Sequence, residues 1–173
     1  RFRVRVTLLE ARDRLLPFLD EEIAERLRVS LRKLGVDLRM KCPYRAVRRR
    51  GDFIVAELGD GSTLEADKLL YAAGRQGNTV GLGLEALGIE ADKRGLVPVN
   101  KTFQTAVPHV YAVGDVVGFP ALASTSMEQG RVAAQHACGV LEKVPAQELL
   151  PYGIYTIPEV STVGETEQSC AKK

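Results

Sequence analysis

The stretch TAVPHVYAVGD, residues 105–115, carries the strongest fold signal of this 173-residue chain. Its apolar residues 110–113 stand between Pro108 and Gly114, which predicts a short buried strand. Asp115 then follows at the carboxyl end of that strand, where open α/β sheets bind their ligands. A carboxylate in an apolar setting needs hydrogen-bond donors, and the hydroxyls of a sugar or ribitol chain would supply them. The alternative is an Asp that only caps the following helix.

The segments before residue 75 predict most of a nucleotide-binding α/β domain. Asp20 is expected to cap a helix that closes at Gly35, because apolar residues recur between them at helical spacing. Gly-Asp-Gly-Ser at 59–62 predicts a hairpin turn. The expected strands are residues 4–10, 36–40, 44–47, 53–58, 63–66 and, as a buried strand, 68–73. No GxGxxG phosphate loop occurs, so we expect either a fragment or a protein that never bound a dinucleotide.

Residues 76–144 predict a second zone. The expected elements are a short helix at 82–87, an extended piece at 97–99 and a long helix from Ser124 to about residue 141. In the long helix, Gly130 would permit close approach, and the residues expected to pack are Met127, Val132, Ala133 and Ala134. Pro145 and Pro151 mark a boundary, after which GIYTIPEVSTVG at 153–164 predicts the first strands of a third domain.

Charge and cysteine content exclude several classes of function. A net charge of +2 is too small to indicate nucleic acid or an anionic membrane surface, and no apolar run approaches the ~20 residues of a membrane span. The cysteines, Cys42, Cys138 and Cys170, are far apart and odd in number, so neither a zinc site nor a redox dithiol is predicted. A reducing, cytoplasmic compartment fits best. His109 and His136 have no partner spacing that suggests a metal or a catalytic triad.

Five motifs, in order along the chain, indicate a family. They are Leu9-Glu10 with Leu15-Leu16-Pro17, YAAGRQGNT at 71–79, VYAVGD at 110–115, LASTSMEQGR at 122–131 and IYTIPEVSTVG at 154–164. Together they resemble the two-dinucleotide-binding-domain flavoproteins of the pyridine nucleotide-disulphide oxidoreductase class, over nearly the whole chain. The resemblance implies an incomplete Rossmann-like α/β flavoprotein that uses FAD, NAD and NADP. The implied domains are a partial NAD(P)-binding domain at 1–75, the closing segment of an FAD-binding domain at 76–145 and the start of the interface domain of a homodimer at 146–173.

The resemblance implies that one group of residues contacts a nicotinamide nucleotide. Glu10 would bond the adenosine ribose hydroxyls, which favours NAD, whereas Arg12 or Arg14 would accommodate the additional phosphate of NADP. Gly74 and Arg75 would turn the backbone close to the bound nucleotide. The alternative for Glu10 and the two arginines is a surface acid flanked by surface arginines. The alternative for Gly74 and Arg75 is a turn without a ligand.

A second group is implied to contact FAD. Gly114 and Asp115 would meet the ribitol, and the backbone of Leu122, Ala123 and Ser124 would run beneath the flavin ring. The following helix would direct its amino terminus, which carries partial positive charge, at the pyrimidine edge of the flavin. The alternative is an ordinary capped helix. No catalytic acid or base and no metal ligand is expected, because the cofactors carry out the chemistry.

Within the family the chain resembles the soluble pyridine nucleotide transhydrogenases in particular. The segments that favour them are ARDRLLPFLDEEI at 11–23, Gly-Asn-Thr at 77–79 and GIYTIPEVSTVGETEQ at 153–168, with Gln129 where dihydrolipoamide dehydrogenases usually carry Glu. This subgroup transfers hydride between NADPH and NAD through a flavin. The first alternative is a disulfide oxidoreductase of the dihydrolipoamide dehydrogenase kind, which a CxxxxC pair would identify. The second is a truncated chain without activity of its own, which would bind FAD and NAD weakly or not at all.

Overall fold

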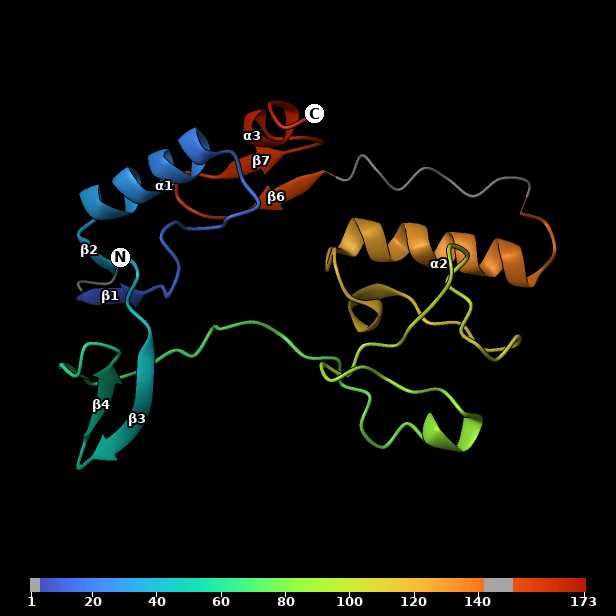
Figure 1. Ribbon diagram of the computed structural model, residues 1–173, viewed down its shortest axis with the longest axis horizontal. Coiled ribbons are helices and arrows are strands. Elements are labelled where there is room, and N and C mark those ends of the chain that lie inside the picture. The colour runs from blue at the N-terminus through green and yellow to red at the C-terminus, as the bar shows by residue number, and fades with distance from the viewer. Residues whose placement is uncertain (1–3, 142–150) are drawn as a thin grey trace. The chain divides into compact units, whose positions relative to one another are not determined.

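The computed structural model describes residues 4–141 and 151–173, and contacts divide the chain into two compact units (Figure 1). The first unit is formed by residues up to Ala72 together with Pro151–Lys173, and the second begins at Ala73. Pro145, expected to mark a boundary, lies outside the described residues. Every helix in the described ranges is too short or too polar to cross a lipid bilayer.

A parallel strand pair with a connecting helix opens the first unit, as predicted (Figure 1). Strand β1 (Val6–Leu9) pairs with β2 (Val36–Arg39), and helix α1 (Glu21–Lys33) joins them. The Asp20 carboxylate accepts the Glu22 N–H at 3.2 Å, which confirms the predicted cap. Gly35, at φ 78°, ends the helix through a 2.8 Å bond from its N–H to the Arg32 carbonyl.

An antiparallel meander follows, also as predicted. It consists of β3 (Tyr44–Arg50), β4 (Phe53–Leu58) and β5 (Thr63–Ala66) in that spatial order. Gly61 adopts φ 86° in the β4–β5 turn, where the Asp60 carboxylate accepts the Ser62 N–H at 2.9 Å and the Ser62 hydroxyl at 2.7 Å. These bonds lower the pKa of Asp60 below its ordinary value.

The predicted buried strand at 68–73 does not form. Leu70 and Tyr71 in this segment are 88% and 67% exposed, and none of the segment is assigned to a strand. The prediction was wrong because it rested on apolar composition alone, whereas a strand also needs a neighbour that satisfies its backbone N–H and C=O groups. No such neighbour lies within the described residues.

The second unit contains little regular structure apart from one helix (Figure 1). Its elements are the 3₁₀ turns η1 (Glu85–Leu87) and η2 (Gly114–Val117) and helix α2 (Ala123–Ala137). The helix expected at 82–87 is therefore reduced to η1, and residues 97–99 form no strand. Residues 110–113 form no strand either, because their pairing is limited to one antiparallel bridge between Gln104 and Tyr111.

The described core of the second unit is centred on Phe103, Val132 and Ala133. Val132 and Ala133 were predicted to pack, and this is confirmed. Met127 and Ala134 were predicted wrongly, since Met127 is 74% exposed and Ala134 is also exposed. Gly130 permits no close approach, because a Cβ built there would meet nothing within 4 Å. A helix of this length buries only one face, and the face that contains Val132 is the one the unit covers.

The C-terminal segment packs within the first unit. It forms a hairpin of β6 (Tyr152–Ile154) and β7 (Val160–Thr162), followed by the short helix α3 (Glu167–Cys170). The second oxygen of the Asp20 carboxylate accepts the Glu167 N–H at 3.0 Å, so one side chain caps both α1 and α3. Phe18 contacts Tyr152, with ring centroids 5.7 Å apart. The hairpin agrees with the strands predicted from 153–164.

Candidate functional sites

Gly114 and Gln129 join the η2 turn to α2. Gly114 is buried at φ 80°, and its N–H donates to Oε1 of Gln129 at 2.7 Å. A Cβ at Gly114 would lie 3.3 Å from the Ser126 hydroxyl, so the turn approaches the first turns of the helix closely. Gln129 is only 5% exposed. The buried Gln129 amide therefore sets the position of the residue that follows Gly114. Its residue type predicted a subgroup of proteins but not this contact.

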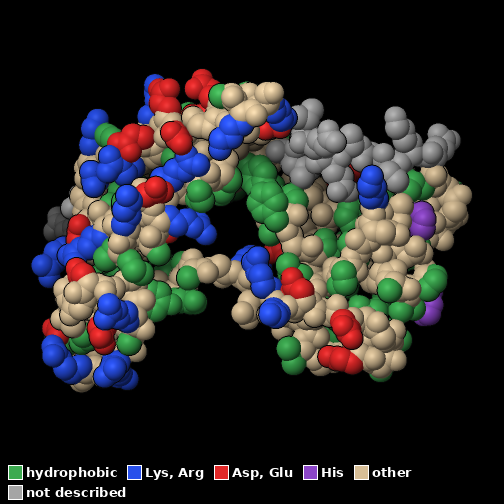
Figure 2. Space-filling model, viewed as in Figure 1, with side chains coloured by type: hydrophobic (Ala, Val, Ile, Leu, Met, Phe, Trp, Pro, Cys, Tyr) green, Lys and Arg blue, Asp and Glu red, His purple; other side chains and the backbone are tan. Residues whose placement is uncertain are grey.

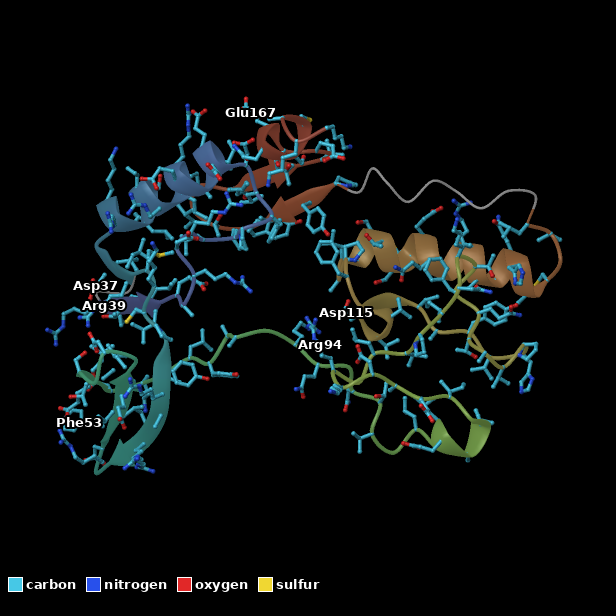
Figure 3. All side chains as sticks on the ribbon, viewed as in Figure 1. Asp37, Arg39, Phe53, Arg94, Asp115 and Glu167 are labelled. Atoms are coloured by element: carbon cyan, nitrogen blue, oxygen red, sulfur yellow. The ribbon has the colours of Figure 1, made fainter. Side chains whose placement is uncertain are left out.

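Asp115 does not lie in the apolar setting expected for it. Asp115, labelled in Figure 3, has a side chain that is 44% exposed. Its Oδ2 lies 3.0 Å from Nη2 of Arg75. The carboxylate faces Arg75 and solvent rather than buried donors, because it lies in the η2 turn and not at the end of a covered strand. The other carboxylate oxygen has no hydrogen bond within the described part of the chain. It is therefore available to accept hydroxyl groups of a ligand.

The backbone around Arg75 is held by hydrogen bonds to Arg94. The Arg75 carbonyl accepts Nη2 of Arg94 at 3.3 Å, and the Gly77 N–H donates to the Arg94 carbonyl at 2.7 Å. A Cβ at Gly77 would lie 2.0 Å from the Gly95 carbonyl oxygen, so only glycine fits there. Gly74, at φ 113°, adopts a conformation that residues with a Cβ rarely take. The Arg75 guanidinium is 80% exposed while its backbone is held in place.

The amino terminus of α2 lies in the same unit and presents free donors. No side chain caps it and no acidic residue occupies its first turn. The first backbone N–H groups of a helix have no intrahelical acceptor, and they carry partial positive charge. Ala123 and Ser124 are exposed, whereas the Thr125 hydroxyl is buried without a hydrogen-bond partner. A group with an acceptor-rich polar edge fits these donors, and a polyhydroxyl chain fits Asp115. The residues present therefore suit a flavin with its ribitol.

A second candidate site lies in the first unit, at the carboxyl edge of β1 and β2. Glu10 continues the pairing beyond the strands: its N–H donates to the Arg39 carbonyl at 3.0 Å and its carbonyl accepts the Cys42 N–H at 2.9 Å. The Glu10 side chain accepts the Arg12 N–H at 2.9 Å. A partly exposed carboxylate is thus held at the edge where α/β sheets bind nucleotides, as the sequence predicts.

Arg12 and Arg14 differ in whether their guanidinium groups are already bound within the protein. Arg14 is bound on both sides, by Glu21 at 2.8 Å and by the Pro17 carbonyl at 2.7 Å. Arg12 is exposed, and its guanidinium makes neither an ion pair nor a hydrogen bond among the described residues. On the face shown in Figure 2, many Lys and Arg side chains lie on the surface among acidic and apolar ones.

Within the described ranges no group of three or more His, Cys, Asp or Glu side chains could hold a metal ion. Cys42, Cys138 and Cys170 are free thiols.

Comparison with known proteins identifies the family. Residues 1–136 match the family described as pyridine nucleotide-disulphide oxidoreductase. The chain belongs to this family. The Rossmann-like α/β fold that the sequence predicted is thereby confirmed, although the chain contains only part of it.

Two soluble pyridine nucleotide transhydrogenases illustrate the similarity to other family members. The proteins of Yersinia pestis (strain Pestoides F) and Yersinia pseudotuberculosis serotype O:1b (strain IP 31758) are each 50% identical to this chain over 165 residues. The match covers 95% of this chain but 35% of each relative, so the chain spans about a third of the length of these curated relatives.

Solved structures of family members share the fold. LpdA from Mycobacterium tuberculosis matches with a TM-score of 0.89 and 31% identity, over 98% of this chain and 37% of that protein. The Cu(II) complex of the HOCl-induced flavoprotein disulfide reductase RclA from Escherichia coli matches with a TM-score of 0.89 and 29% identity, over 98% of this chain and 39% of that one.

Proposed function

We propose that this chain is part of an FAD-dependent oxidoreductase that transfers hydride between NADPH and NAD. The enzyme would be a soluble pyridine nucleotide transhydrogenase of the Si-specific type. The observation that carries the proposal is the 50% identity to transhydrogenases over 95% of the chain. Structural relatives that include a disulfide reductase are less similar, at 29–31% identity. The proposal extends to a cytoplasmic location and to a homodimeric whole protein, whose interface domain would begin near residue 146.

The second unit supplies the groups that would hold FAD. Asp115 would accept hydrogen bonds from ribitol hydroxyls, at ~1.5–3 kcal/mol for each bond to a charged group. Leu122 would supply backbone beneath the ring, and the free N–H groups of Ala123 and Ser124 would face its pyrimidine edge. When bound, the flavin would accept hydride from one nicotinamide nucleotide and donate it to another.

Arg75 and Gly114 would have positioning roles. Arg75 already pairs with Asp115, so a ligand that approaches the carboxylate also meets a guanidinium suited to phosphate. Gly114, through its bond to Gln129, would keep the distance between Asp115 and the amino terminus of α2 constant. In the first unit Glu10 would bond the adenosine ribose of NAD or NADP, with Arg12 and Arg14 beside it. Gly74 would allow the backbone turn that precedes Arg75.

A chimera tests the function directly. This chain would replace the matching 165 residues of the Yersinia pestis transhydrogenase, and reduction of thio-NAD by NADPH would be measured without any added disulfide. Retained activity together with bound FAD supports the proposal. A chimera that folds and binds FAD but transfers no hydride from NADPH to thio-NAD would contradict the proposal.

The 173-residue chain itself is expected to have little activity, because no GxGxxG phosphate loop is present to anchor a pyrophosphate. Isothermal titration with FAD and with NAD measures this. Micromolar affinity for either compound would contradict the expectation.

A further inference from the structure

Residues 11–20 run from the carboxyl edge of β1 and β2, where Glu10 lies, to the start of α1, and we call these residues the strap. A turn within the strap is closed by a 2.9 Å bond from the Leu19 N–H to the Leu16 carbonyl. Leu15 and Leu19, on either side of this turn, are buried at 8% and 1% exposure. Leu16 itself adopts φ 45°, a conformation disfavoured for a residue with a Cβ. Such a conformation persists only where surrounding contacts hold it.

The C-terminal segment, residues 151–173, holds the α1 end of the strap. The Asp20 carboxylate, which caps α1, also accepts the Glu167 N–H at the start of α3 at 3.0 Å, so α3 lies next to the amino terminus of α1 (Figure 1). In return, Oε1 of Gln168 accepts the Glu21 N–H at the start of α1 at 3.4 Å. The first N–H groups of a helix have no intrahelical acceptor and carry partial positive charge. Each helix therefore completes the cap of the other, with the Asp20 charge between them.

Two further contacts join the strap to its surroundings. The Phe18 ring, in the strap turn, lies with its centroid 5.7 Å from that of the Tyr152 ring in β6. Arg14 donates to the Pro17 carbonyl at 2.7 Å and to the Glu21 carboxylate at 2.8 Å, so its side chain joins the strap to α1. The strap turn, the start of α1 and the C-terminal segment therefore form one connected set of contacts.

The other end of the strap is bonded to the backbone and side chains at the carboxyl edge of β1 and β2. The Arg12 N–H donates to the Glu10 carboxylate at 2.9 Å, and the Arg12 carbonyl accepts the Lys41 N–H at 2.8 Å. Residues 13–19, between the two ends, form neither helix nor strand. Segments of this kind open at a low free-energy cost unless contacts hold them. The conformation of the strap therefore depends on what is bonded at both of its ends.

We propose that docking of the C-terminal segment fixes the strap and thereby orders the edge at Glu10. In the docked state Leu16 is held at positive φ, and in the released state the bond from Glu167 to Asp20 is open and that strain is relieved. Coupling between two places is reciprocal, so a ligand that orders the Glu10 edge also strengthens docking. The functional consequence rests on the proposed function: the first residues of the interface domain would respond to a nucleotide bound at Glu10, and their docking would favour its binding.

Glu167→Pro tests the coupling from the C-terminal side of the contact. Proline has no N–H to donate to Asp20, yet it suits the first position of a helix. Thr166 before it already has the extended backbone that precedes proline, at φ −86° and ψ 160°. The matched control is Glu167→Ala, which removes the same exposed carboxylate (Figure 3) but keeps the N–H. Any difference between the two variants therefore reports on the hydrogen bond to Asp20.

The measurement is amide hydrogen exchange of the full 173-residue chain, followed by NMR. In Glu167→Pro the amides of Leu19, Arg12 and Lys41 should exchange about tenfold faster, which corresponds to the loss of one hydrogen bond to a charged group. In Glu167→Ala they should stay within about twofold of the unaltered chain. Amides of β4 report on the rest of the unit and should not change in either variant.

Arg14→Gln tests the reciprocal direction. It removes the bonds from the strap to the Pro17 carbonyl and to Glu21, and the exchange of the Glu167 amide should then rise. Arg32→Gln, an exposed residue of the last turn of α1, is the control and should leave that amide unchanged. If Glu167→Pro also exposes the β4 amides to exchange, this second pair of variants decides.

The outcomes distinguish this inference from the proposed function. Faster exchange at Leu19 without a change at Arg12 and Lys41 overturns the coupling to the edge at Glu10. Equal effects of the proline and alanine variants, or no effect of Arg14→Gln, also overturn it. These measurements contain no nucleotide, so each of these results leaves the proposed function in place. A chimera that binds FAD but transfers no hydride overturns the proposed function and leaves the coupling in place.

Discussion

Replacing Gln129 by Met tests whether its side-chain bond to Gly114 holds the η2 turn in place. Methionine has nearly the same length and shape as glutamine but cannot accept the Gly114 N–H as an amide oxygen does. The bond is short, at 2.7 Å, and both residues are buried. The substitution therefore leaves a buried N–H without a partner, which costs ~1–3 kcal/mol.

A central value of ~2 kcal/mol gives a measurable effect. For a unit of this size each kcal/mol lowers the melting temperature by ~4–8 °C, so we expect a loss of about 8–16 °C. Hydrogen exchange of α2 amides such as that of Val132 reports on the second unit alone, and the Gly114 amide should itself lose protection. Circular dichroism should show that the helix content at low temperature is retained.

The matched control is Gln135→Met on the same helix. Gln135 is half-buried, and its side chain makes no hydrogen bond among the described residues. Its replacement should change stability by less than ~0.5 kcal/mol. If Gln129→Met is no more destabilising than Gln135→Met, the contact does not hold the turn, and the argument that it positions Asp115 is refuted.

Other substitutions test the remaining contacts. Asp20→Ala removes the shared cap of α1 and α3 and should cost about 1–3 kcal/mol in a urea titration, whereas Asp20→Asn, which still caps, should cost less. Gly77→Ala places a Cβ 2.0 Å from a backbone carbonyl and should prevent native folding of the second unit, as judged by NMR dispersion. Gly130→Ala meets no atom and should stabilise α2 by ~0.5–1 kcal/mol, measured by thermal melting. Hydrogen bonds from Ser62 lower the pKa of Asp60 in the folded chain. The stability that Asp60 contributes should therefore be present above the pKa that Asp60 has in the unfolded chain, and be lost as the pH falls through its lower folded pKa. A carboxyl NMR titration measures this, and an Asp60 pKa that Ser62→Ala leaves unchanged would contradict it.

The helix cap, the helix end and the hairpin turn were predicted well, because each depends on interactions between residues that are close in the sequence. The Asp20 cap bonds an amide two residues away, and Gly35 supplies the left-handed residue that ends the helix. The 59–62 turn and the meander around it depend on short-range hydrogen bonds and on adjacent strands. Such interactions can be inferred from residue types at fixed spacing.

Predictions that needed a partner failed or were incomplete. The apolar runs at 68–73 and 110–113 have strand composition, but a strand forms only where another strand satisfies its backbone, and composition does not reveal that. For the same reason the helical pattern did not show that Met127 faces solvent.

The sequence by itself determined the family and the identity of most candidate residues, since motifs such as VYAVGD and the acid at Glu10 are contiguous or in constant order. Only the tertiary structure decided which groups meet. It bonds Gln129 to Gly114, pairs Arg75 with Asp115 and brings Lys41 beside Arg12 while Arg14 is bound elsewhere. These contacts join residues 15, 40 and 29 positions apart along the chain. Chain folding determines which of these residues come into contact, whereas residue type and spacing determine only which interactions each side chain can make there.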